Sequence, residues 1–195
     1  MKKLFVAFFA IATLASCSKD NIVGSGNTSI EARPLSNFSK IDVEGNTNVS
    51  IVYGNNFEVK VEAYQNLLQH LKTTVSNGTL KIGYKSGTGI SNDNSHVYIT
   101  LPSLTKVMAK GLCIINVASG NEDVFEAELT GNPKLKAFDL TAREAKITMT
   151  GQGIAEITVG EDLDVTITGT STVYYKGNPN TVSSDITGNG RVIKL

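Results

Sequence analysis

The stretch Glu128–Leu195 repeats one short phrase four times: Leu129-Thr130-Gly131, Met149-Thr150-Gly151, Ile167-Thr168-Gly169 and Ile186-Thr187-Gly188. Its glycines are 20, 18 and 19 residues apart. After each glycine comes a polar residue, which is Asn132, Gln152, Thr170 or Asn189. A fixed period of this length indicates a repeat fold, in which one turn of chain cannot bury its apolar side alone and stacks on the next.

The repeat predicts an all-β fold, a parallel β-helix or β-solenoid of about four to five rungs that advance about 4.8 Å each. Stacking places the four threonines in one column, where β-branched side chains pack well, and the glycines at corners that need positive φ. The phrase Lys110-Gly111-Leu112, which precedes Gly131 by one period, indicates an entry rung whose sequence has drifted. We interpret these columns as residues that form the corners between strands. The alternative is that they form an exposed stripe that binds a ligand.

The N-terminal part has a different character and predicts partly antiparallel pairing. Alternating apolar and polar residues predict strands at 38–44, 48–53, 57–64 and 97–101. The pair Asn77-Gly78 predicts a hairpin with a type I′ turn, because both central residues of that turn need positive φ. Leu67, Leu68 and Leu71 follow helical spacing and predict one short helix. We expect this region to cap one end of the column.

The first residues predict export and a lipid anchor. Lys2 and Lys3 precede an uncharged, mostly apolar run that suits a signal peptide and is too short to span a bilayer. The run ends in Leu14-Ala15-Ser16-Cys17, which resembles the bacterial lipobox. We therefore predict a lipoprotein signal peptide at residues 1–16 and lipidation of Cys17, with an ordinary secretory leader as the alternative.

The residues after Cys17 predict a tether and a location. Gly-, Ser- and Asn-rich sequence indicates a lipidated flexible tether at 17–35, followed by a single domain at 36–195. The tract Ser18-Lys19-Asp20-Asn21 resembles signals that send lipoproteins to the cell surface in some Gram-negative bacteria. We predict an outer-membrane protein and slightly favour the cell surface over the periplasmic face.

Composition and motifs restrict the chemistry. The 18 basic and 18 acidic residues balance, which argues against nucleic acid as a partner and leaves the lipid anchor as the membrane contact. The loop at 86–95 has oxygen ligands for Ca²⁺ but a single carboxylate, Asp93, so we interpret it as a solvated loop and predict no metal or cofactor. Cys113 lies among Leu and Ile and indicates a small buried hydrophobe. The densest acids fall where a loop between rungs is expected: Glu161, Asp162 and Asp164.

Several phrases resemble the head GIN domain family of autotransporter adhesins, a domain of unknown function in bacterial envelope lipoproteins. These phrases are Phe38-Ser39-Lys40-Ile41-Asp42-Val43-Glu44-Gly45, Thr79-Leu80-Lys81-Ile82, Val97-Tyr98-Ile99-Thr100-Leu101-Pro102-Ser103-Leu104, the Thr-Gly rungs and Val173-Tyr174-Tyr175-Lys176-Gly177-Asn178-Pro179. The resemblance spans 38–195 and implies a right-handed β-helix-like fold and surface interaction, with no catalytic residues to transfer. The family's rungs usually read Gly-Ser-Gly, and the rungs of this chain depart from that pattern.

Three functions remain open at this point. We favour a non-catalytic, adhesin-like envelope lipoprotein that displays a rigid β-helix to a glycan or to an envelope or host protein. The alternatives are a polysaccharide-active, pectin-lyase-like enzyme and a structural envelope protein without a specific ligand. The enzyme needs at least two carboxylates from different rungs within about 10 Å. Tyr174 and Tyr175 are the candidates for an exposed binding patch, and packing in the core or a turn is their alternative role.

Overall fold

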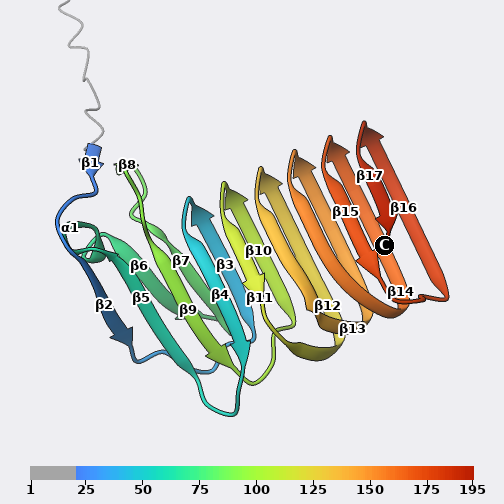
Figure 1. Ribbon diagram of the computed structural model, residues 1–195, viewed down its shortest axis with the longest axis horizontal. Helices are drawn as coiled ribbons and strands as arrows, with labels where there is room; N and C mark the ends of the chain where they lie inside the picture. The colour runs from blue at the N-terminus through green and yellow to red at the C-terminus, as the bar shows by residue number, and fades with distance from the viewer. Residues whose placement is uncertain (1–20) are drawn as a thin grey trace, which may run out of the picture.

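The computed structural model describes residues 21–195, and this part of the chain is an all-β fold with one short helix (Figure 1). Both parallel and antiparallel strand pairs occur, as the sequence predicts. The N-terminal half contains β1 (Asn21–Val23), β2 (Thr28–Arg33), β3 (Lys40–Gly45), β4 (Asn48–Tyr53), β5 (Glu58–Tyr64), α1 (Gln65–Leu68), β6 (Leu71–Ser76), β7 (Thr79–Tyr84), β8 (Gly89–Ser91) and β9 (His96–Leu101). The rest contains β10 (Lys106–Gly111), β11 (Ile114–Val117), β12 (Gly120–Gly131), β13 (Lys134–Gly151), β14 (Ile154–Gly169), β15 (Thr172–Lys176), β16 (Thr181–Gly188) and β17 (Arg191–Lys194).

One column of glycines organises the parallel part. We call it the glycine column: Gly45, Gly111, Gly131, Gly151, Gly169 and Gly188, which pair in parallel register and all have positive φ. The N–H of Gln152 donates to the Gly131 carbonyl at 2.8 Å, and the same bond recurs at the other corners. A Cβ on Gly151 would lie 2.3 Å from the Gly131 oxygen, so the close approach of one corner to the next excludes a side chain.

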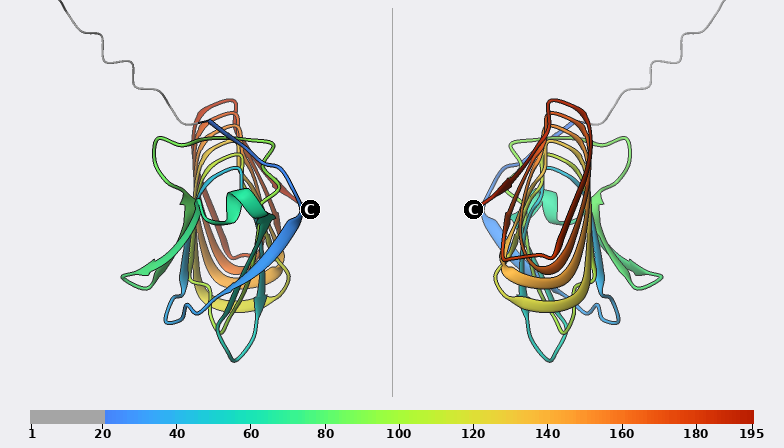
Figure 2. Two further views of the ribbon diagram at one scale, coloured as in Figure 1. Left: turned by 90° about the vertical axis from the view of Figure 1, so that its left-hand side faces the viewer. Right: turned by 90° about the vertical axis from the view of Figure 1, so that its right-hand side faces the viewer.

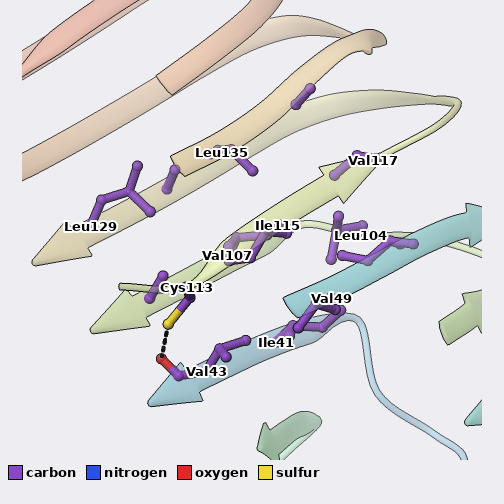
Figure 3. Packing of buried hydrophobic residues seen from close by; sticks show 14 of the residues in the cluster. Ile41, Val43, Val49, Leu104, Val107, Cys113, Ile115, Val117, Leu129 and Leu135 are labelled. Carbon is purple, nitrogen blue, oxygen red and sulfur yellow. Dashed lines mark hydrogen bonds between the residues drawn. The ribbon is translucent and has the colours of Figure 1, made fainter. Parts of the chain in front are cut away.

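Each pass of the chain from one glycine of the column to the next buries alternate side chains. In β13, Ile147 and Met149 point inward and are buried, and they pair with Val165 and Ile167 of the next pass. Figure 3 shows inward side chains from successive passes meeting in one continuous core. The threonines of the repeat pair with one another on the outer side of the same strands, as predicted.

The two ends of the stack are built differently (Figure 2). At the N-terminal end, β5 pairs antiparallel with β2 and β9, β6 pairs antiparallel with β7, and α1 lies across the stacked strands. The buried Leu67 and Leu68 of α1 close the core there. At the C-terminal end all eight residues of β16 are exposed.

Several local predictions can be compared with these elements. Asn77 and Gly78 both have positive φ, which confirms the predicted hairpin turn. Gly111 pairs in parallel with Gly131, one period later in the sequence. The helix is shorter than predicted, because the chain enters β6 at Leu71. Residues 21–33 form β1 and β2 and pair with the body, so the folded part begins before the predicted boundary at residue 36.

Candidate functional site

A groove of about 520 Å³ lies beside the first corners of the glycine column. Its volume falls in the range of small-ligand sites. We call it the loop groove, and it is formed by the turn after β3, the segment from the end of β7 to β8, and the turn after β10. Its lining mixes carboxylate, amide, aromatic and aliphatic groups from Glu44, Asn46, Tyr84, Ile90, Asp93 and Leu112, among others.

Hydrogen bonds fix one wall of the loop groove. The Asp93 Oδ1 atom accepts from the Tyr84 hydroxyl at 2.8 Å and from the Ser95 N–H at 2.9 Å. Burial raises the pKa of Tyr84 well above its ordinary value, and the Asp93 carboxylate adds to that rise, so the phenol stays neutral and donates. The parallel pairing of β1 with β8, together with a 2.7 Å bond from Asn92 to the Gly24 carbonyl, holds the loop in place.

These bonds bear on the Ca²⁺ alternative considered for this loop. In Asp93, its single carboxylate, the Oδ1 atom is engaged by Tyr84 and Ser95, whereas the Oδ2 atom is buried without a hydrogen-bond partner. Within residues 21–195, no group of three or more His, Cys, Asp or Glu side chains is arranged to hold a metal ion. The loop groove presents carboxylate, amide and hydroxyl groups together with the amino group of Lys85, so its lining can hydrogen-bond a polar ligand.

A second polar cluster lies on the outer face of the sheet formed by β5, β9 and β4, and we call it the outer patch: Ser50, Glu62, His96 and Tyr98. The His96 Nε2 atom lies 2.8 Å from Ser50 Oγ, and the Tyr98 hydroxyl donates to Glu62 at 2.8 Å. The rings of His96 and Tyr98 stack at 4.3 Å. Burial lowers the pKa of His96, and the Glu62 carboxylate opposes that shift.

The outer patch was not predicted from the sequence. Ser50 and His96 are brought together by the parallel pairing of β4 with β9, and Glu62 by the antiparallel pairing of β5 with β9. A serine beside a histidine is the contact of a nucleophile with its base. However, the Glu62 carboxylate is bonded to Tyr98, and the ladders on both sides of β9 use the strand's backbone N–H groups. The arrangement therefore lacks an oriented acid and free donors for an oxyanion.

The predicted site residues lie in separate places. Tyr174 is on the outer side of β15, where it pairs with Glu156 and Ile193. Tyr175 points the other way and packs half-buried against the core. Cys17, the predicted lipidation site, lies outside the described residues.

Cys113 occupies the interior position predicted for it. It is fully buried, and its Sγ lies 3.4 Å from the Gly45 carbonyl and 3.7 Å from that of Val43 (Figure 3). Burial raises the pKa of the Cys113 thiol, so the thiolate that would act as a nucleophile is disfavoured.

Acidic side chains from successive passes do gather along another edge of the stack. A shallow groove of about 340 Å³ is lined by Glu126, Glu144, Asp162 and Asp164. Ion pairs engage two of them: Glu126 binds Lys106 at 3.0 Å, and Glu144 binds Arg143. We call this the acidic groove. Its carboxylates come from neighbouring strands, an arrangement that the position of the acids relative to each glycine did not predict.

The sequence matches a known protein family over most of its length. Residues 37–119 and 114–179 match the model of the family described as putative auto-transporter adhesin, head GIN domain. The chain belongs to this family. The GIN-domain resemblance carried by the N-terminal strand phrase and the Thr-Gly rungs is thereby confirmed.

Solved structures share the fold of this GIN-domain chain. A putative adhesin from Bacteroides fragilis is 18% identical, with a TM-score of 0.61 over 89% of this chain and 100% of its own. A putative lipid binding protein from Parabacteroides distasonis is also 18% identical, with a TM-score of 0.52 over 90% and 100%. No match was found among curated proteins. At this identity the likeness concerns the fold alone.

Membership of an adhesin-like family indicates a protein of the cell envelope or cell surface. Among the described residues, no helix has the length and apolar character that a membrane crossing requires.

Proposed function

We propose that this chain is a non-catalytic, adhesin-like lipoprotein of the outer membrane that displays a rigid scaffold to a glycan or to an envelope or host protein. The in-register parallel passes and their shared glycine column support a right-handed parallel β-helix of about four to five rungs as that scaffold. The lipobox-like phrase ending at Cys17 supports the anchor, and the short Lys/Asp tract behind it favours the cell surface.

The loop groove is the observation that carries the binding role. Sugars present hydroxyls above apolar C–H faces, and the groove offers both kinds of partner: polar groups from Glu44 and Asn46, and apolar groups from Ile90 and Leu112. Leu112 is 57% exposed, which leaves its side chain available for contact with a ligand. Tyr84 contributes an aromatic wall whose hydroxyl is already oriented by Asp93.

A printed array of bacterial and host surface glycans tests this proposal with the full chain. Leu112→Arg places a charged side chain at the rim of the loop groove, and we expect it to weaken binding to any array hit about tenfold or more. Val52→Arg is the matched control, because Val52 is also an exposed aliphatic residue, on β4, away from the groove. Equal loss in both variants, or in neither, would contradict the assignment to the loop groove.

Anchoring is tested separately in cells. Cys17→Ser removes the thiol that would carry the lipid, so we expect the protein to leave the membrane fraction. Protease added outside intact cells then reports the exposed face, and cleavage is expected if the protein is on the surface. Retention of Cys17→Ser in the membrane would exclude lipidation at this residue as the anchor.

The acidic groove is the feature that a second candidate function, a polysaccharide-active enzyme, would use. Glu144 and Asp162 are paired neighbours on β13 and β14, which satisfies the requirement for carboxylates from different rungs. We favour binding over hydrolysis, because Glu144 is ion-paired with Arg143. Release of reducing ends from an acidic polysaccharide, abolished by Glu144→Gln and Asp162→Asn, would support the enzyme instead.

A further inference from the structure

Positions that are buried in one pass of the chain are partly exposed at the equivalent place in the last pass. β16 pairs with β14 in parallel, which sets Val182 beside Leu163 and Ile186 beside Ile167. Leu163 and Ile167 are buried, whereas Val182 and Ile186 are 43% and 37% exposed. The apolar interior of the stack therefore continues to the C-terminal face of β16 and is open there (Figure 2).

The backbone at this end is also open. Within residues 21–195, β16 pairs with β14 alone and β17 pairs with β15 alone. The N–H and C=O groups on the far side of both strands have no strand partner in this part of the chain. A long exposed edge with apolar side chains is a template for pairing with another chain.

Charge indicates what kind of partner fits. The one charged side chain of β16 is the acid Asp185, whereas β17 carries the bases Arg191 and Lys194. Among the described residues neither Asp185 nor Arg191 takes part in a salt bridge. Asp185 pairs with Thr166 and Arg191 with Thr172, both on the outer side of the stack. The end thus has an acidic strand, β16, and a basic strand, β17, which are joined through the corner at Gly188.

We propose that a second copy of this chain covers the C-terminal end, tail to tail, with β16 of each copy lying on β17 of its partner. A two-fold axis makes such an interface self-complementary. When the axis runs along the strands, Asp185 of each copy comes near the partner's Arg191, and the apolar side chains of β16 lie over the apolar side of the partner's β17. When the axis runs across the strands, β16 meets β16 and the two Asp185 side chains approach each other, so like charges disfavour that arrangement.

The same geometry closes the assembly at two copies. The N-terminal end is built from α1 and antiparallel strands, so its edge strands, β2 and β6, do not repeat the surface that β16 and β17 form at the other end. An isologous contact that uses one end of each molecule gives a dimer and not a fibre. This inference does not depend on the lipid anchor or on ligand binding.

Charge exchange tests the dimer with the full chain in detergent micelles. Light scattering coupled to size exclusion measures the protein mass over a range of concentrations. We expect the natural sequence to be dimeric, and Asp185→Arg or Arg191→Glu to weaken association at least about tenfold through like-charge contact. The double variant Asp185→Arg with Arg191→Glu restores opposite charges, and we expect it to recover the dimer. Asp139→Arg, at an exposed acid of β13, is the matched control.

Each contrary result would overturn the proposal. A monomeric natural chain at high concentration excludes the dimer. Single charge reversals that leave the mass unchanged exclude the contact between β16 and β17. A double variant that stays monomeric excludes the pairing of Asp185 with Arg191, and loss of the dimer in Asp139→Arg would show that the effect is not specific to this end.

Discussion

The two ends of the stack differ in how the apolar core is covered. At the N-terminal end the core is closed by dissimilar pieces, namely a four-residue helix and antiparallel strands, whose buried leucines each fill an individual space. At the C-terminal end the same position of each pass carries the same kind of residue, and the last pass is left uncovered. Stability at the N-terminal end thus depends on individual buried side chains. In the repeat it depends on the glycine column, whose close contacts between successive corners leave no space for a side chain.

The largest effect is expected where the column is tightest. Gly151→Ala puts a Cβ 2.3 Å from the Gly131 oxygen at a residue whose φ is 114°, so it combines overpacking with backbone strain. We expect it to lower the free energy of unfolding by about 4 kcal/mol. Chemical denaturation followed by circular dichroism measures the loss.

Gly45→Ala is the control for the same substitution. Gly45 has nearly the same φ, 108°, but a Cβ there meets nothing within 4 Å, because it is the first member of the glycine column. We expect a loss of about 1–2 kcal/mol from backbone strain alone. Equal losses at Gly45 and Gly151 would show that conformation, and not the stacking of corners, requires glycine.

A smaller effect distinguishes the two ends directly. Leu67→Ala removes a fully buried side chain of α1, and we expect it to cost about 3 kcal/mol by leaving a cavity in the cap. Ile186→Ala makes a similar truncation on the open face of β16, where we expect a loss below about 1 kcal/mol. The comparison is made on dilute, monomeric protein, and a loss at Ile186 as large as that at Leu67 would contradict an uncovered C-terminal end.

The repeat was largely predictable from the sequence because its geometry recurs at short, regular intervals. Thr130, Thr150, Thr168 and Thr187 stack as their spacing predicts, and Gly111 joins the same column. Gly45 was not recognised as a member, because α1 and six strands, β4 to β9, lie between its strand and β10, which ends at Gly111. A period cannot be read across an insertion of that length.

The candidate sites were beyond sequence reasoning for a related reason. The loop groove joins three turns that lie far apart in the chain, and its wall depends on β1 and β8, two three-residue strands with no recognisable alternation. The contact between Ser50 and His96 depends on the register of β4 with β9, which neither strand encodes alone. In contrast, the interior position of Cys113 follows from its apolar neighbours, and its burial is confirmed.

The smallest predicted effect is a pH dependence of stability that arises from His96. The chain's two histidines, His70 and His96, both lie before the repeat. The folded protein holds the pKa of His96 below its ordinary value near 6.5, chiefly through burial, with Glu62 opposing. The unfolded chain therefore binds a proton more readily than the folded chain. The stabilisation from neutral His96 is complete above about pH 6.5 and is lost as the pH falls toward the folded pKa.

This dependence can be isolated with variants. Urea unfolding between pH 5 and pH 7.5 should show a midpoint that decreases on acidification, and His96→Asn should flatten part of that decrease because it removes the titrating group. His70→Asn makes the same substitution at the chain's other histidine and serves as the reference variant. An unchanged profile in His96→Asn would mean that the burial of His96 does not favour the neutral imidazole, and the outer patch would then contribute no pH sensitivity to the N-terminal half.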